Sequence, residues 1–303
     1  MKTRDFGWLL LLGIIWGAAF LFINIVVDDV PPLTVVAGRM LLAAATLLIV
    51  LAATGRRFPA RSLWPLLVVL GVINNVLPFA LITWSEQHIT SSLAATLNAT
   101  MPLFTFAIAV ALAVERPTFD RALGLVVGFG GAVVLLNPSF GDLTSSSALA
   151  EFAVIAASAC YALATVLARD RLHEGDPLAF AAGQLFAGAI IAIPLALAVD
   201  GAPHLHVGAG AALSWVTLGI VCTAVAYVIF FQLVQRISAT QVSLVSYIIP
   251  VVGTLLGWAA LGDHVGWTLI AGLALILAGL AIVNGTSRSL LERALGRDTS
   301  PGA

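Results

Sequence analysis

The chain has 303 residues, of which 60% are hydrophobic and 10% are charged, and its formal net charge at pH 7 is −1. Water-soluble domains are about 45–50% apolar and about 25% charged. The composition therefore excludes a water-soluble protein and indicates a chain dissolved in the lipid bilayer, with no nucleic-acid partner.

Ten apolar windows follow one another along the chain, and each approaches the length of about 20 residues that a helix needs to span a bilayer. They cover residues 7–27, 33–53, 63–84, 92–114, 121–138, 148–168, 178–199, 211–234, 240–261 and 266–284. The alternation typical of barrel strands is not visible, so we expect helices, which satisfy their backbone polar groups internally. The first window is too long for a signal-peptide core and is interpreted as a retained helix. The sequence predicts an all-α integral membrane protein with ten transmembrane helices.

The second half of the chain repeats the first. The stretch from Pro32 to Arg39 aligns without a gap with the stretch from Pro177 to Gln184, which begins 145 residues later. A second gapless match, at an offset of 148 residues, places Leu70-Gly71 on Leu218-Gly219, Pro102 on Pro250, Gly124 on Gly272 and Gly131 on Gly279. Each half holds five windows, and an odd number inverts the second copy relative to the first across the membrane. We expect two inverted five-helix repeats, over residues 1–144 and 145–303.

The ten windows separate the charged residues by side. Of the 14 Lys and Arg residues, Arg39 alone lies in the interior of a window, and all the others, including Arg121 at the first position of its window, fall on the side that holds both termini. The loops of the opposite side contain no Lys or Arg but hold Asp28, Asp29, Asp142, Asp200 and Asp263. Because short loops rich in Lys and Arg stay in the cytoplasm, we expect a multi-pass protein of the inner (plasma) membrane with both termini inside the cell.

Motifs in both halves resemble the EamA family of the drug/metabolite transporter superfamily, whose members are ten-helix inner-membrane carriers built from two five-helix repeats. The resemblance extends over about residues 7 to 284. It rests on Trp16-Gly17 with Phe20, on Pro32 to Arg39, on Pro102 followed by Val114-Glu115-Arg116, on Gly124, Gly128 and Gly131, and on Tyr227, Pro250 and Gly257. It implies a secondary transporter, most commonly an exporter of amino acids or related metabolites, and does not specify the substrate.

The chain departs from the family pattern at two positions. Where the second copy often carries Glu after its fourth helix, this chain has Gly262-Asp263, which puts a symmetric role for these acids in doubt. The counterpart of Arg39 in the second copy is Gln184, so only the first repeat offers a cation.

Arg39 is the most informative single residue of the sequence, because it is a charged residue inside a predicted spanning helix. A charged residue at the centre of a spanning helix costs about 2.5–3.5 kcal/mol on insertion scales and marks a functional site by default. Two interpretations remain open. Arg39 binds an anionic group of the substrate, or its long side chain pairs with Asp28, Asp29 or Glu86 near the outer end of its helix.

Further candidate substrate-binding residues occupy mid-window positions that the repeat makes equivalent. They are Trp16 with Tyr161, Asn75 with Thr223, Phe79 with Tyr227, and Asn98 with Ser246 and its neighbour Tyr247. These aromatic and hydrogen-bonding but uncharged side chains suit a small amphipathic solute. The alternative is that each one only hydrogen-bonds a neighbouring helix. Pro102 and Pro250 are candidate hinges, because both copies keep a proline whose missing backbone donor loosens the helix.

The sequence predicts no catalytic residues, no cofactor and no metal site. His204 and His206 have no third ligand nearby, and Cys160 and Cys222 fall inside windows as inert thiols. No carboxylate lies at the centre of a window, so ion coupling would use an acid at a helix end, proceed by exchange, or be absent.

We therefore predict a secondary transporter that moves a small-molecule substrate by alternating access. A channel or facilitator would need a ring of like charges or a symmetric filter. A membrane-embedded enzyme would need a nucleophile, a base or metal ligands that converge within the windows. The oligomeric state stays open.

Overall fold

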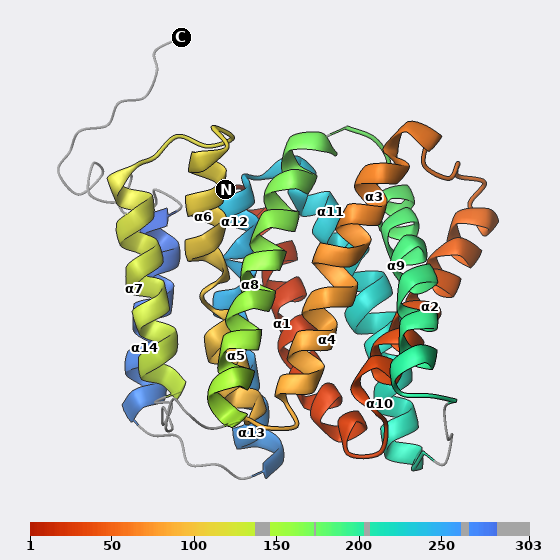
Figure 1. Ribbon diagram of the computed structural model, residues 1–303. Coiled ribbons are helices and arrows are strands. Elements are labelled where there is room, and N and C mark those ends of the chain that lie inside the picture. The colour runs from red at the N-terminus through yellow and green to blue at the C-terminus, as the bar shows by residue number, and fades with distance from the viewer. Residues whose placement is uncertain (137–145, 173, 203–206, 262–266, 284–303) are drawn as a thin grey trace, which may run out of the picture.

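The computed structural model describes residues 1–136, 146–172, 174–202, 207–261 and 267–283. Within these ranges every regular element is helical, which confirms the all-α prediction (Figure 1). Asp142, Asp263, His204 and His206 lie outside the described residues. The helices are α1 (Thr3–Val27), α2 (Pro32–Ala53), α3 (Trp64–Gly71), α4 (Leu77–Ser85), α5 (Ser91–Asn98), α6 (Met101–Ala111), α7 (Phe119–Leu136), α8 (Ser146–Arg171), α9 (Pro177–Val199), α10 (Ala209–Gly219), α11 (Ala226–Arg236), α12 (Ala239–Ser243), α13 (Val245–Leu261) and α14 (Trp267–Val283).

Seven helical segments of the described chain are long and apolar enough to cross a membrane, judged by length and composition. They are Thr3–Val27, Pro32–Ala53, Arg61–Ser85, Leu93–Ala111, Ser147–Arg171, Pro177–Val199 and Ala209–Arg236, and two shorter apolar helices cover Ala239–Gly253 and Ile270–Val283. Large apolar side chains such as Ile49, Val126 and Leu213 point outward from the bundle. An apolar outer surface on spanning helices is the surface that lipid requires.

Three short irregular elements interrupt the regular helices. η1 (Arg61–Leu63) is a 3-10 turn that leads into α3. η2 (Val72–Val76) joins α3 to α4, and η3 (Ile220–Val225) joins α10 to α11 as π-helical segments inside otherwise continuous spans. The two π-helical segments begin 148 residues apart, which is the offset of the second repeat match. Such segments are rare and occur frequently at functional sites.

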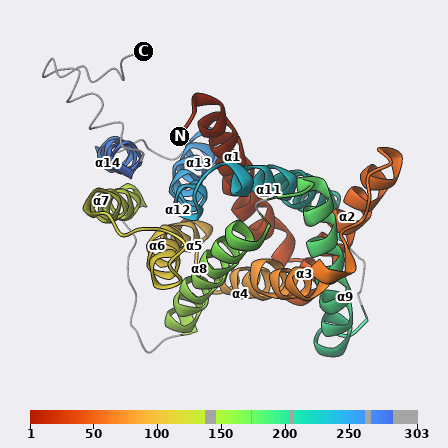
Figure 2. The same cartoon turned by 90° about the horizontal axis from the view of Figure 1, so that it is seen from above.

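The helices stand roughly upright and side by side, with α7 and α14 paired at one edge and α2 and α9 at the opposite edge (Figures 1 and 2). Glycines allow α7 and α14 to approach closely. A Cβ atom added to Gly124 would lie 2.9 Å from the carbonyl oxygen of Gly279, and one added to Gly279 would lie 2.6 Å from that of Gly124. Close backbone packing through small residues is the usual way in which helices associate in lipid.

The two candidate hinge prolines lie in spans that are broken. Pro102 stands in the first turn of α6, after α5 has ended at Asn98. Pro250 lies inside α13, which begins just after α12 has ended at Ser243. The sequence pattern predicted one continuous helix over residues 92–114, and the structure differs there. Proline is tolerated in the first turn because that position needs no backbone donor, so Pro102 suits a helix start better than a mid-helix kink.

Candidate functional site

A cavity lies inside the bundle, and residues of α1, α2, α4, α5, α6, α8, α11 and α13 line it. Seven of the residues singled out from the sequence line it: Trp16, Arg39, Phe79, Asn98, Tyr161, Tyr227 and Ser246. The rest of the wall is largely apolar and includes Phe20, Met101 and Phe230. A mostly apolar, aromatic wall with a few polar groups is typical of a small-molecule site.

Arg39 reaches the cavity from α2 and is only 4% exposed. Its Nε donates a hydrogen bond to the Thr223 hydroxyl over 2.6 Å, and one terminal nitrogen lies 3.5 Å from the carbonyl oxygen of Cys222. The guanidinium carbon stands 3.8 Å from the ring centre of Phe79, which is a cation–π contact. In the described part of the chain no carboxylate forms an ion pair with Arg39. The pairing with Asp28, Asp29 or Glu86 that the sequence left open is therefore not formed in this conformation.

Side chains of the cavity wall also bind two backbone carbonyls in the π-helical segments. The Tyr227 hydroxyl donates to the Asn74 carbonyl over 2.6 Å, and the Trp16 indole donates to the Cys222 carbonyl over 3.2 Å. Asn74 and Cys222 occupy equivalent positions in the two copies, 148 residues apart. The rings of Trp16 and Tyr227 meet edge to face with centroids 5.9 Å apart. The aromatic wall and the π-helical segments thus hold each other in place.

Three of the sequence candidates do not line the cavity. The Asn75 side-chain oxygen accepts a hydrogen bond from Gln184 over 2.6 Å, and Thr223 stands behind Arg39. The Tyr247 hydroxyl donates to the Leu125 carbonyl over 2.6 Å, and its ring packs against Gly128 on α7. All three are fully buried between helices, which is the structural alternative that the sequence left open for such residues.

Asn74, Thr165 and Phe230 line the cavity but were not among the sequence candidates. Thr165 lies one helical turn after Tyr161 and Phe230 one turn after Tyr227, so helical spacing from the chosen residues could have found both. The repeat does not point to Asn74, because its counterpart Cys222 is neither aromatic nor a strong hydrogen-bonding residue. The only signal for Asn74 is its position next to Asn75.

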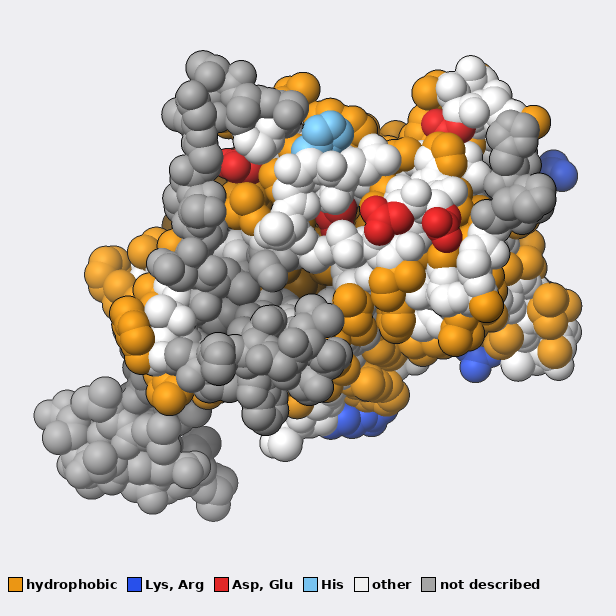
Figure 3. Space-filling model, turned by 90° about the horizontal axis from the view of Figure 1, so that it is seen from below, with side chains coloured by type: hydrophobic (Ala, Val, Ile, Leu, Met, Phe, Trp, Pro, Cys, Tyr) orange, Lys and Arg blue, Asp and Glu red, His pale blue; other side chains and the backbone are white. Residues whose placement is uncertain are grey.

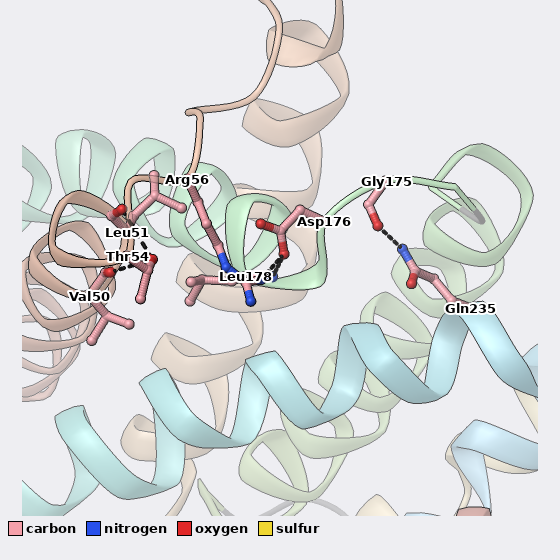
Figure 4. A network of polar contacts seen from close by, with 8 residues as sticks. All are labelled: Val50, Leu51, Thr54, Arg56, Gly175, Asp176, Leu178 and Gln235. Atoms are coloured by element: carbon pink, nitrogen blue, oxygen red, sulfur yellow. Dashed lines mark hydrogen bonds and ion pairs between the residues drawn. The ribbon is translucent and has the colours of Figure 1, made fainter.

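Polar contacts tie the helices together at both ends of the α2·α9 pair. At one end Arg56 forms an ion pair with Asp176 over 2.8 Å, and Gln235 donates to the Gly175 carbonyl over 3.1 Å (Figure 4). At the other end the Asp200 carboxylate accepts hydrogen bonds from the backbone and the hydroxyl of Thr34 over 2.7 and 2.8 Å. The cavity therefore lies between two levels of cross-links that join the halves of the chain.

The described residues contain no group of three or more His, Cys, Asp or Glu side chains that could hold a metal ion. Cys160 and Cys222 are free thiols. The polar groups of the cavity are thus a guanidinium, amides, hydroxyls and an indole.

Known proteins resemble the chain along nearly its whole length. A protein named probable terminal-alkyne amino-acid exporter, from Streptantibioticus cattleyicolor, is 28% identical over 299 residues, 98% of this chain and 97% of that protein. The uncharacterized transporter YoaV of Bacillus subtilis is 21% identical over 88% of this chain and 92% of its own length. The uncharacterized inner membrane transporter YedA of Escherichia coli K12 is 27% identical over 92% of this chain and 90% of its own length.

A solved crystal structure shares the fold, with a TM-score of 0.78 at 21% identity over 96% of this chain and 99% of that chain. The EamA-like transporter family matches the sequence twice, over residues 6–137 and again over residues 148–285. Together the two matches span most of the chain. The protein belongs to the EamA-like transporter family.

Proposed function

We propose that this protein is a secondary transporter that exports a small carboxylate-bearing metabolite, an amino acid or a related compound, across the inner membrane by alternating access. The observation that carries the proposal is Arg39, a buried cation on the wall of a central cavity with no carboxylate partner among the described residues. A buried charge without a counter-charge is costly, and a substrate carboxylate would supply the missing partner.

The hydrogen-bond donors of the Arg39 guanidinium support a carboxylate ligand. A guanidinium carries five N–H donors, and the contacts with Thr223 and Cys222 occupy two of its nitrogens. Arg39 makes no other hydrogen bond to the described residues, so its remaining donors can form the charge-assisted bonds that guanidinium groups make with carboxylates. The amino-acid exporter named among the relatives is consistent with such a substrate.

The remainder of the wall favours a solute with an apolar part. Trp16, Phe79, Tyr161 and Phe230 offer aromatic surface, while the amide of Asn98 and the hydroxyl of Ser246 offer hydrogen bonds. We propose that the wall residues named here, with Arg39, Asn74 and Tyr227, bind the substrate, and that Asn75, Thr223 and Tyr247 support them from behind.

Several contacts support ten helices in two inverted repeats, over residues 1–144 and 145–303. A Cβ on Gly71 would lie 3.0 Å from the Gln184 carbonyl oxygen, and a Cβ on Gly219 would lie 3.3 Å from the Arg39 carbonyl oxygen. The repeat relates Gly71 to Gly219 and Gln184 to Arg39, so the two contacts are equivalent in the two copies. The packing of whole helices shows the same symmetry. In one direction α1 packs against α13, and the equivalent helix α8 packs against α5 and α6. The helices α2 and α7 pack against their own repeat counterparts, α9 and α14.

Both interruptions of the helices near the prolines border the cavity. Asn98 ends α5 and Met101 begins α6, while Val245 and Ser246 begin α13, and all four residues line the cavity. At a helix break the backbone hydrogen bonds that keep the two parts aligned are missing. The bundle can therefore bend there at a small cost in free energy. We therefore retain Pro102 and Pro250 as hinge positions for the rocking of the two repeats.

The distribution of charge supports cytoplasmic termini. The face at which α1 leads to α2 and α4 leads to α5 shows Asp and Glu side chains and one His, with Lys and Arg only at its margin (Figure 3). At the opposite end, Arg61 begins η1, Arg236 ends α11 and Arg56 lies in the loop after α2. Protease-accessible tags on the two ends should be cleaved from the same side of the membrane. Cleavage from opposite sides would mean an odd number of crossings and would exclude the inverted repeat.

Counterflow in proteoliposomes tests the function itself. Purified protein would be reconstituted and presented with a panel of labelled amino acids, sugars and nucleosides. Saturable uptake that one solute competes away supports a carrier. Conduction without saturation would indicate a channel, and formation of a product would indicate an enzyme, and either result would overturn the proposal.

A further inference from the structure

Glu86 follows the last residue of α4 and is only 5% exposed. Its Oε2 accepts a hydrogen bond from the Ser91 hydroxyl over 2.8 Å. Its Oε1 is fully buried and has no hydrogen-bond partner among the described residues. A buried carboxylate oxygen without a donor is costly when it is charged, whereas a protonated acid loses most of that cost. The surroundings of Glu86 therefore suit the neutral acid.

The helices packed around this position carry few groups that could compensate the charge. Glu151 lies on α8, Asp28 and Asp29 follow α1, His88 lies in the connection after Glu86 itself, and Arg39 lies on α2. Of these groups, Arg39 is the one whose charge acts on Glu86. Burial raises the pKa of Glu86 to about 8, against smaller lowering effects of the Ser91 hydrogen bond and of Arg39. We therefore expect the carboxyl to change its charge in the physiological range of pH.

We propose that Glu86 is a proton-binding site that is linked to anion binding at Arg39, so that a proton and an anionic substrate group bind together. The proposal deepens the proposed function and rests on it. A carboxylate on Arg39 cancels the positive charge that favours ionised Glu86, so anion binding promotes uptake of a proton. By reciprocity, protonation of Glu86 strengthens anion binding at Arg39 by the same factor.

The balance of charge is simple. One proton from water joins Oε1 of Glu86 as one carboxylate enters the cavity, and no bond other than the new O–H is made. The proton then accompanies the solute, and net flux follows the sum of the two gradients. Export in this scheme requires a solute gradient larger than the opposing proton gradient.

Infrared difference spectroscopy of the protein in lipid nanodiscs tests the site without knowledge of the substrate. The carbonyl stretching band of a protonated carboxylic acid is followed through a pH titration, with and without sodium acetate as the anion probe. We expect a band that titrates at about pH 8, disappears in Glu86→Gln and remains in Glu151→Gln, the matched control for a second buried acid on the same face. Acetate should move the midpoint to higher pH in the wild type and leave it unmoved in Arg39→Ala.

Two results would overturn the proposal. The first is a spectrum in which Glu86→Gln removes no band near neutral pH, which would mean that Glu86 is ionised there. The second is a Glu86 band whose midpoint is the same with and without acetate, which would separate the proton site from Arg39. The wild-type titration needs no mutant to fold. Failure of transport in proteoliposomes would affect the proposed function alone, because the spectroscopic readout does not depend on it.

Discussion

Arg39 donates from its Nε to the hydroxyl of Thr223 over 2.6 Å, and Gln184 donates to the side-chain oxygen of Asn75 over the same distance. The repeat relates Arg39 to Gln184 and Thr223 to Asn75. The two halves of the chain thus make the same interhelical contact, once with a cation and once with a neutral amide. Because glutamine makes the equivalent hydrogen bond, that bond does not require a positive charge. The charge of Arg39 also contacts the ring of Phe79, and we propose that it serves to bind the substrate.

Replacing Arg39 with glutamine makes the first copy equal to the second at this position. We expect Arg39→Gln to keep expression and Tm close to the wild type while counterflow of a carboxylate solute falls by about 10-fold to 100-fold, the equivalent of one charge-assisted hydrogen bond. Gln184→Ala is the matched control, because it removes the equivalent contact without touching a charge. Equal losses of expression and transport in Arg39→Gln would leave Arg39 with a structural role only.

Two buried tyrosines allow the residues that line the cavity to be distinguished from those that only stabilise the bundle around it. The hydroxyls of Tyr227 and Tyr247 each donate over 2.6 Å to a carbonyl in the protein interior, that of Asn74 and that of Leu125. Each Tyr→Phe change leaves a carbonyl without this donor, so we expect both to lower stability by about 1–3 kcal/mol. Only Tyr227→Phe should also change substrate affinity, because Tyr227 lines the cavity and Tyr247 does not. Thermal denaturation and counterflow affinity measure the two effects. An unchanged affinity in both Tyr227→Phe and Trp16→Phe would remove these residues from the site.

The pairing of α7 with α14 depends on glycine. A Cβ on Gly124 would lie 2.9 Å from the Gly279 carbonyl oxygen and from the Val283 backbone nitrogen, and backbone atoms cannot move aside as a flexible side chain can. We expect Gly124→Ala to lower the Tm of the detergent-solubilised protein clearly. Gly130→Ala, on the same helix, is the control and should leave Tm unchanged or slightly raised, because nothing lies within 4 Å of its added Cβ. Similar Tm values for the two variants would contradict the close packing of these helices.

Glu86 makes the stability of the fold depend on pH. Burial raises its pKa to about 8 from an ordinary value of 4.5. Between these values the native state binds more protons than the unfolded state, so stability falls as pH rises through this window. We expect Tm to decline from acidic pH towards about pH 8, and Glu86→Gln to flatten part of that decline. Glu151→Gln is the control. A decline of the same steepness in Glu86→Gln would assign the pH dependence to other groups.

Much of this protein could be predicted from its sequence because the bilayer imposes a simple rule on it. A spanning helix needs an unbroken apolar run of membrane thickness, and such runs are visible residue by residue. Several helices of the structure begin and end within a few residues of the predicted windows, as α2 (Pro32–Ala53) does for residues 33–53 and α9 (Pro177–Val199) for residues 178–199. The window over residues 92–114 is instead divided between α5 and α6. The duplication and the motifs of the family are equally local features of the chain.

The composition of the cavity wall was decided by tertiary structure. The sequence selected Asn75, but η2 inserts π-helical geometry into its helix, and one added residue turns all that follows by about 100°. Asn74 consequently lines the cavity and also donates to the side-chain oxygen of Gln184 over 3.5 Å, while Asn75, which does not line the cavity, accepts a hydrogen bond from Gln184 over 2.6 Å. Hydropathy records how deep a residue lies in the membrane, whereas the direction of its side chain depends on helix irregularities and on neighbours more than a hundred positions away. The sequence by itself therefore determined the membrane class, the approximate position of the helices and the family. Only the packed bundle decided that Arg39 stands in a cavity where, within the described ranges, no carboxylate forms an ion pair with it.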